Sequence, residues 1–106
     1  MAARIQVPET VKRGEPVEVR LLVQHPMETG YRFDDGGKAI PRNVITSLSC
    51  RYNGNEVFRA DMSQGIAANP YLQFYVRAEV SGELQFQWVD DEGVQGSESK
   101  TLNVTG

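Results

Sequence analysis

The sequence is poor in the side chains that most catalytic and metal sites need. It has one cysteine, Cys50, and one histidine, His25. A single cysteine excludes an internal disulfide and a zinc site made of cysteines alone, and one histidine is too few for a blue-copper centre. A catalytic triad would depend on His25, whose neighbours Pro26 and Met27 supply no base, and the sequence contains no Gly-x-Ser-x-Gly motif. We therefore expect a protein that is not an enzyme and holds no metal or cofactor.

Long apolar runs and an excess of basic residues are also missing. No apolar run approaches the roughly 20 residues of a transmembrane helix. The 11 basic and 14 acidic residues give a net charge of −3, with Lys and Arg scattered along the chain, which argues against nucleic acid as a partner. Residues 1–16 lack the apolar segment of a secretory signal. The protein would therefore be cytoplasmic, have lost its signal, or be exported with a partner.

The sequence does contain enough apolar residues to form one hydrophobic core. Its 106 residues are 40% hydrophobic, which disfavours disorder and suits a single domain spanning residues 1–106. Alternation is clear in 17–24, where Val17, Val19, Leu21 and Val23 share one face. Residues 4–7 indicate a short edge strand that ends at Pro8. Period-two patterns of this kind predict half-buried β-strands.

Further strands follow in the second half of the chain. Residues 44–52 and 56–60 flank Asn53-Gly54, a dipeptide typical of a two-residue hairpin turn. Residues 71–80, 83–89 and 100–104 complete the pattern, with these side chains expected to face inward: Phe74, Val76, Ala78, Val80, Leu84, Phe86, Trp88, Leu102 and Val104. About seven short strands in about 100 residues predict an all-β fold, an immunoglobulin-like antiparallel sandwich.

Two features that could suggest chemistry have simpler interpretations. The acidic pairs Asp34-Asp35 and Asp90-Asp91 lie beside glycines without calcium-loop spacing, which indicates solvated turns. Cys50 occupies an inward position of a strand, where a free cysteine acts as a small hydrophobic residue.

The candidate binding residues are aromatic, sulfur-containing and cationic. Residues 25–43 form a long loop, and loops of this length are either functional or disordered. Residues 71–76 carry apolar or aromatic side chains on both faces, so one face is left over for a partner. Because aromatic residues and Arg dominate interface energetics, we expect partner contacts first at Tyr71 and Tyr75, then at Tyr31 and Phe33, with Met27 and Arg42 completing the set.

Five motifs in order and spacing make the sequence resemble the SoxZ family between about Ile5 and Val104. They are His25-Pro26-Met27-Glu28-Thr29-Gly30, Gly37-Lys38-Ala39-Ile40-Pro41-Arg42-Asn43, Tyr52-Asn53-Gly54 with Glu56-Val57-Phe58, Ala67-Ala68-Asn69-Pro70-Tyr71-Leu72, and Trp88-Val89-Asp90-Asp91-Glu92-Gly93. The sequence departs from the family pattern at Phe33 and at 63–65, both in candidate binding loops.

The resemblance implies a non-catalytic, immunoglobulin-like subunit that pairs with SoxY in the thiosulfate-oxidising carrier SoxYZ. In that family SoxY holds the sulfur intermediates on the cysteine of a flexible Gly-Gly-Cys-Gly-Gly arm, which visits SoxAX, SoxB and the sulfane dehydrogenase. This sequence has no such arm, so the resemblance places the sulfur on the partner rather than on Cys50. It also implies a periplasmic location reached by co-export with SoxY.

Two other function classes remain open at this point. One is a stand-alone immunoglobulin-like adhesion or accessory module, for which only the strand pattern argues. The other is a thiol enzyme acting through Cys50, which would require that thiol to be exposed and easily deprotonated.

Overall fold

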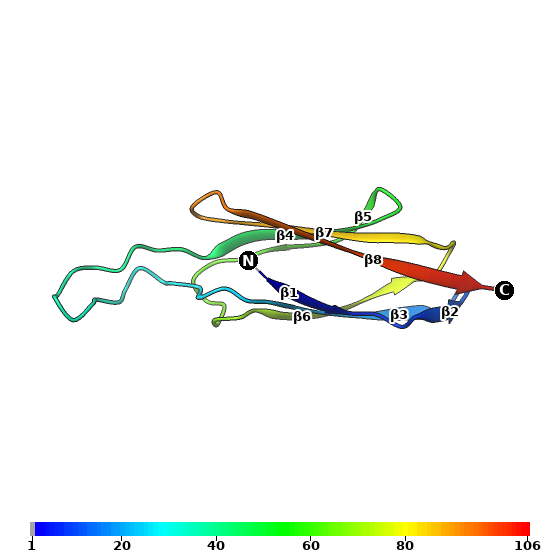
Figure 1. Ribbon diagram of the computed structural model, residues 1–106, viewed down its shortest axis with the longest axis horizontal. Coiled ribbons are helices and arrows are strands. Elements are labelled where there is room, and N and C mark those ends of the chain that lie inside the picture. Colours follow the sequence, from blue (N-terminus) through cyan, green and yellow to red (C-terminus); the bar gives the residue numbers. More distant parts are fainter. Residues whose placement is uncertain (1) are drawn as a thin grey trace.

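The computed structural model describes residues 2–106, which form eight β-strands and no helix. Two sheets pack face to face (Figure 1), and the predicted all-β, immunoglobulin-like sandwich is confirmed. The smaller sheet has the order β1-β3-β6 and the larger the order β2-β8-β7-β4-β5. The strands are β1 (Ala3–Gln6), β2 (Thr10–Lys12), β3 (Pro16–Val23), β4 (Ile45–Tyr52), β5 (Asn55–Asp61), β6 (Tyr71–Arg77), β7 (Gly82–Asp90) and β8 (Gln95–Thr105).

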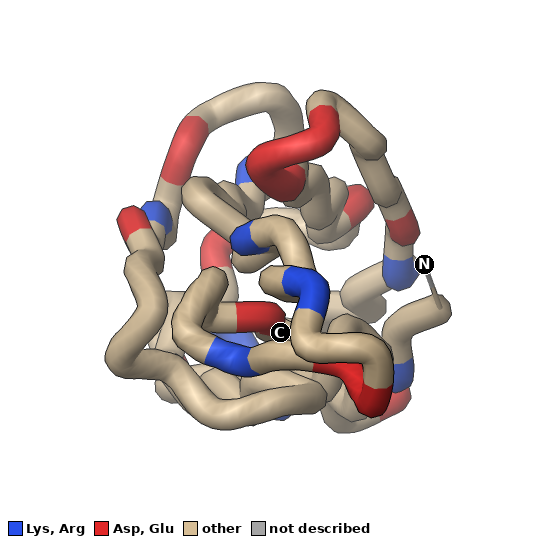
Figure 2. The backbone as a smooth tube through the Cα atoms, turned by 90° about the vertical axis from the view of Figure 1, so that its left-hand side faces the viewer, with Lys and Arg blue, Asp and Glu red and all other residues tan. Residues whose placement is uncertain are grey.

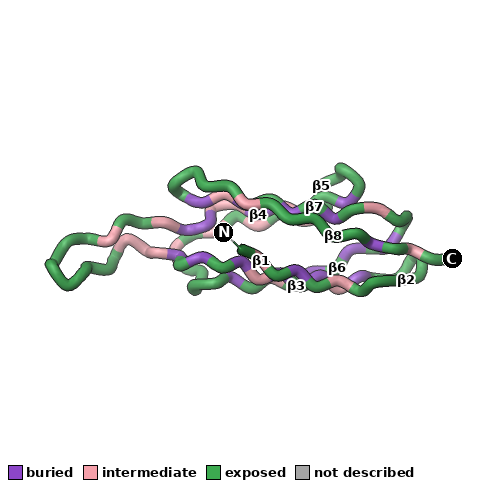
Figure 3. The backbone as a smooth tube through the Cα atoms, in the orientation of Figure 1, coloured by how far each residue is buried: buried purple, intermediate pink, exposed green. Residues whose placement is uncertain are grey.

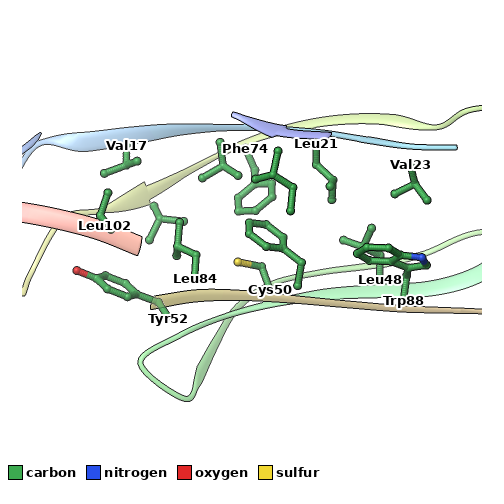
Figure 4. Close-up of a cluster of buried hydrophobic side chains, with 14 of the residues drawn as sticks. Val17, Leu21, Val23, Leu48, Cys50, Tyr52, Phe74, Leu84, Trp88 and Leu102 are labelled. Carbon is green, nitrogen blue, oxygen red and sulfur yellow. The ribbon is translucent and has the colours of Figure 1, made fainter. Parts of the chain in front are cut away.

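The core lies between the sheets and is filled by the alternate residues of each strand (Figure 4). The smaller sheet contributes the fully buried side chains of Val17, Val19, Leu21 and Val23. Facing residues on the larger sheet include Leu48, Cys50, Leu84, Phe86 and Trp88, all buried. Burying each Val, Leu or Phe contributes roughly 1.5–3 kcal/mol, so this alternation determines which face of each strand turns inward. In Figure 3 buried residues alternate with more exposed ones along strands of both layers.

One flank of the sandwich is closed by a pair of aromatic rings. Phe58 of β5 and Phe74 of β6 stack with ring centroids 4.0 Å apart and an interplanar angle of 4°. Because β5 and β6 are edge strands of different sheets, this pair joins the two sheets where no backbone hydrogen bond can.

The N-terminal segment passes from one sheet to the other. β1 pairs antiparallel with β3, and β2 pairs in parallel with the end of β8. Pro8 lies between them and has no N–H to continue the first ladder, which ends at Gln6, one residue before the end of the strand predicted at 4–7. β2 was not predicted, because three residues are too few to show alternation.

Two strand assignments differ from the sequence-based expectation. Val80 is exposed rather than inward, because β6 ends at Arg77 and the chain turns. That turn is held by the Tyr52 hydroxyl, which accepts the backbone N–H groups of Glu79 and Val80 and donates to the Val80 carbonyl. β8 begins at Gln95 instead of Lys100; the added residues Ser97, Glu98 and Ser99 are polar and show no alternation.

The Asn53-Gly54 turn has the predicted geometry. Both residues have positive φ, 48° and 84°, and Tyr52 pairs directly with Asn55 across the turn. This backbone is the one that favours Asn-Gly in two-residue hairpins.

Gly96 should be intolerant of a side chain, since a Cβ there would lie 2.2 Å from Trp88 Nε1. The indole is buried and cannot move away freely. We expect Gly96→Ala to lower the free energy of unfolding by about 1–3 kcal/mol, measured by urea denaturation. Ser97→Ala, at the exposed neighbouring position, should change it by less than about 0.5 kcal/mol. Equal stabilities of the two variants would contradict this packing.

Candidate interaction site

Residues 24–44, which include the long surface loop predicted at 25–43, form a hairpin arm that projects from one end of the sandwich (Figure 1). Glu28 and Asn43 exchange backbone hydrogen bonds of 2.8 and 2.9 Å, and the Ile40 N–H donates to the Arg32 carbonyl at 2.9 Å. At the tip, Asp34 Oδ1 accepts the N–H groups of Gly36 and Lys38, both at 2.9 Å. The arm makes the molecule 61 Å long and 19 Å wide. It carries Tyr31 and Phe33, which are 76% and 68% exposed.

Met27 lies in the core, so its expected role as a partner contact is corrected. Its side chain is only 4% exposed, and its sulfur accepts the Ile45 N–H at 3.3 Å. A backbone φ of 51° turns Met27 inward at the base of the arm. A buried thioether anchors the arm and has no surface to offer a partner.

His25 is also buried, and it connects the arm to the β7–β8 turn. The Met27 N–H donates to His25 Nδ1 at 2.9 Å, so the ring proton is on Nε2, which donates to Asp90 Oδ2 at 3.2 Å. Asp90 Oδ1 accepts the N–H groups of Glu92 and Val94, both at 3.0 Å. Burial alone would raise the pKa of Asp90, but the hydrogen bonds from Val94, His25 and Glu92 outweigh it and lower the pKa below its ordinary value.

Two further contacts complete this arm clasp, which we define as His25, Met27, Asn69, Asp90 and Asp91. Asn69 Oδ1 accepts the His25 N–H at 3.1 Å, while the Asn69 N–H donates to the His25 carbonyl at 2.8 Å. Asp91 Oδ2 accepts Arg42 Nε at 2.9 Å and the Val44 N–H at 3.1 Å. Arg42, a predicted partner contact, is thus half-exposed and already ion-paired. The clasp residues hold the base of the arm in position.

The outer face of the smaller sheet collects the main predicted residues, and we call it the tyrosine face. It consists of the outward side chains of β1, β3 and β6: Arg4, Gln6, Glu18, Arg20, Leu22, Tyr71, Gln73, Tyr75 and Arg77. Tyr71 and Tyr75 are 54% and 61% exposed, on the side opposite Phe74 as predicted. Gln73 donates to Glu18 at 3.1 Å, and Arg20 pairs with the same carboxylate. A hollow of about 220 Å³ lies beside them, lined by Gln6, Val7, Pro8, Glu18 and Arg20.

The outer face of the larger sheet has a different chemistry. Its hollow of about 500 Å³ is lined mainly by polar side chains: Ser47, Ser49, Arg51, Arg59, Gln87, Gln95 and Ser97. Within residues 2–106 it presents no exposed aromatic residue. Viewed along the long axis, basic and acidic residues are interspersed around the backbone (Figure 2). The tyrosine face is therefore the sheet surface with apolar and aromatic groups to bury.

Cys50 is fully buried in β4, as predicted. Burial raises the pKa of its thiol to about 12, so the thiolate required for sulfur chemistry is scarce at neutral pH. Among residues 2–106 no three His, Cys, Asp or Glu side chains gather in a way that could hold a metal ion. The described residues also include no helix long and apolar enough to cross a membrane.

The sequence from residue 5 to residue 101 matches the family model described as "Sulphur oxidation protein SoxZ". The chain belongs to the SoxZ family. The motifs that carried the resemblance lie largely in the arm clasp and its surroundings, which explains their spacing: SoxZ-type motifs far apart in sequence meet at the base of the arm. No curated protein sequence is similar enough to this SoxZ-family chain to count as a match.

Several solved structures share the sandwich of this SoxZ-family chain. Superoxide reductase (neelaredoxin) from Ignicoccus hospitalis has 22% identity and a TM-score of 0.75, covering 99% of this chain and 81% of that one. A putative superoxide reductase from Thermotoga maritima has 18% identity and a TM-score of 0.74, covering 98% and 86%. The sulfur carrier protein SoxY from Chlorobium limicola f. thiosulfatophilum has 17% identity and a TM-score of 0.69, covering 99% and 80%. At these identities the likeness shows the fold alone.

Loss of the Asp90 charge should lower the stability of the fold, because this carboxylate is part of the arm clasp. The folded-state pKa of Asp90 is lowered, so its ionisation stabilises the fold above the unfolded pKa, and this contribution is lost as the pH falls through the folded pKa. Asp90→Asn should lower the free energy of unfolding by about 1–3 kcal/mol at pH 7, because an amide N–H would face the His25 Nε2–H.

Urea denaturation at a series of pH values measures this effect, with Asp35→Asn at the exposed tip as the matched control. The stability gap between wild type and Asp90→Asn should narrow in acid. A gap that is unchanged from pH 7 down through the acidic range would contradict a stabilising carboxylate.

The Cys50 thiol should be unreactive in the folded chain. Iodoacetamide should modify it at least about a hundredfold more slowly at pH 7.5 than in urea, since burial blocks access and suppresses the thiolate. Cys50→Ala should cost about 1 kcal/mol of stability. Equal alkylation rates in both conditions would show an accessible thiol.

Proposed function

We propose that this SoxZ-family chain is a non-catalytic subunit of a thiosulfate-oxidising carrier, in which it binds SoxY and SoxY bears the sulfur. The observation that carries the proposal is the pair of exposed tyrosines, Tyr71 and Tyr75, on one sheet face of a chain whose single thiol is buried. A subunit of this kind acts through its surface and needs no reactive group of its own.

The tyrosine face has the composition of an interface centre. Tyrosine rings offer large apolar area with a polar end, and they are enriched among residues that dominate binding energy. Leu22 and Tyr71 lie side by side in register, which adds an aliphatic group to the ring. A permanent subunit pair would bury such groups in an apolar interface, as obligate complexes do.

The hairpin arm supplies a second surface for transient partners. The arm projects beyond the sandwich (Figure 1), and its exposed side chains Tyr31 and Phe33 could reach SoxAX, SoxB or the sulfane dehydrogenase while the tyrosine face is occupied. The arm clasp would hold these aromatic side chains at a fixed position relative to the carrier. We place the complex in the periplasm, with this chain exported together with SoxY.

A charge placed within the tyrosine face should disrupt the pair. Tyr75→Asp should leave the isolated chain folded, because Tyr75 points away from the core, and should weaken SoxY binding at least about tenfold, or about 1.4 kcal/mol. Titration calorimetry against the SoxY of the same organism measures the affinity.

Gln87→Asp is the matched control, because Gln87 is exposed on the outer face of the larger sheet. It should bind SoxY as the wild type does. Unchanged affinity in both Tyr71→Asp and Tyr75→Asp would remove this face from the interface. A chain that binds no SoxY at all would favour the stand-alone module instead.

A further inference from the structure

The hydrogen-bond pattern between β3 and β6 fixes where the β6 backbone points. The Val23 N–H donates to the Pro70 carbonyl at 3.0 Å, and the Ala78 N–H donates to the Glu15 carbonyl at 2.9 Å. Both pairs extend the register in which Val17 faces Val76. In an antiparallel ladder every second pair of residues is hydrogen-bonded. The backbone N–H and C=O groups of Leu72, Phe74 and Val76 are therefore hydrogen-bonded to β3. The N–H and C=O groups of the intervening residues therefore point toward the free edge: Tyr71, Gln73, Tyr75 and Arg77.

These outward backbone groups have no partner among residues 2–106. β6 is the last strand of its sheet and pairs with β3 alone, so no strand of the described chain lies on the side to which the backbone of Tyr71, Gln73, Tyr75 and Arg77 points. The same four residues place their side chains on the tyrosine face. The edge and the face thus form one continuous surface, with unpaired backbone groups about 7 Å apart along it.

The other sheet edges carry features that discourage pairing with another chain. β5 has the charged residues Glu56, Arg59 and Asp61 and a bulge opposite Cys50 and Arg51. β8 turns Glu98 and Lys100 toward the inner side, in register with Phe86 and Leu84. β1 has four residues and is followed by Pro8, and β2 has three. Bulges, charges, proline and short length are the usual protections of an edge strand.

β6 lacks these protections. Its seven residues contain no proline and no bulge toward β3, and Arg77 at the last position is its one charge. An edge strand of this length, aromatic and unprotected, is a template for strand addition. Natural proteins leave such an edge open when a partner covers it.

The charges of the tyrosine face indicate the chemistry of the partner. Arg4, Arg20 and Arg77 lie on the tyrosine face and Glu18 is its one carboxylate, so the face is locally basic on a chain with a net charge of −3. A partner strand with neutral or acidic outward side chains complements this surface. SoxY, whose sandwich aligns with 99% of this chain, has the matching architecture to present such a strand.

We propose that the β6 edge binds an edge strand of SoxY, so that the smaller sheet continues across the subunit boundary. This proposal rests on the proposed function and specifies how the pair is joined. The backbone of Tyr71, Gln73, Tyr75 and Arg77 supplies the hydrogen bonds, and the tyrosine rings pack on the added strand and its neighbours.

Amide hydrogen exchange of the full chain, free and bound to SoxY, tests this mode of binding. In the free chain the amides of Leu72, Phe74 and Val76 should exchange slowly, and those of Tyr71, Gln73, Tyr75 and Arg77 rapidly. Binding of SoxY should slow exchange of the amides of Tyr71, Gln73, Tyr75 and Arg77 at least about tenfold, so that every amide from Tyr71 to Arg77 becomes protected. If SoxY binds but those four amides still exchange rapidly, strand addition is wrong while the proposed function stands.

A matched pair of variants separates the backbone from the side chain. Gln73→Pro removes an N–H that points to the free edge and makes no internal hydrogen bond, whereas Gln73→Ala keeps the N–H and removes only the side chain. We expect Gln73→Pro to weaken SoxY binding at least about tenfold and Gln73→Ala less than about threefold. Equal affinities would overturn strand addition. If Gln73→Pro does not fold, hydrogen exchange of the wild type decides the matter alone.

Two further outcomes would point elsewhere. Protection of the four amides in the isolated chain at high concentration, lost in Gln73→Pro together with self-association, would make a second copy the occupant and overturn the assignment to SoxY. A wild-type chain that fails to bind SoxY would refute the proposed function and this inference together.

Discussion

Burial of alternate side chains along β6 is the constraint from which the surface of this molecule follows. Phe74 stacks on Phe58 across the sandwich, and Val76 packs in the core beside it. Once these side chains turn inward, Tyr71 and Tyr75 must turn outward, because successive residues of a strand point to opposite faces. In the same arrangement the backbone groups of the inward residues are hydrogen-bonded to β3, and those of the outward residues point to the free edge of the sheet. A single packing choice thus creates both the aromatic face and the unpaired edge.

The strands could be predicted from the sequence wherever one face is buried and the other is not. Val17–Gln24 alternates cleanly, and the side chains predicted to face inward are fully buried as expected: Val17, Val19, Leu21 and Val23. Where the alternation fades, the prediction failed: β8 starts five residues early among polar residues, β2 is three residues long, and Val80 continues an apolar pattern past the end of its strand. The alternation of apolar and polar residues does not indicate where a strand stops pairing with the strand beside it.

The candidate site was predictable only in part, for a related reason. Tyr71 and Tyr75 follow from alternation alone. The burial of Met27 and His25 depends on Ile45 and on Asp90, which is 65 positions away in the chain, and contacts at such separation leave no mark on local composition. The notable spacing of the His-Pro-Met, Asn-Pro-Tyr and Asp-Asp motifs was visible, and its physical meaning, the arm clasp, became clear only when the fold brought them together.

The sandwich itself does not determine what the protein does, since superoxide reductases and a sulfur carrier share it at low identity. Membership of the SoxZ family points to sulfur oxidation, and the local chemistry narrows the role: the thiol is buried and protonated, and the distinctive surface is aromatic and unpaired. These features fit a subunit that holds a carrier and leaves the sulfur chemistry to it.

Intact mass spectrometry can decide whether this chain binds the carrier without bearing the sulfur itself. The purified complex with SoxY would be supplied with thiosulfate and the sulfur-oxidising enzymes, and the mass of each chain measured before reduction. We expect sulfur adducts on SoxY and an unchanged mass for this chain. A sulfur adduct on this chain, mapped to Cys50, would contradict it.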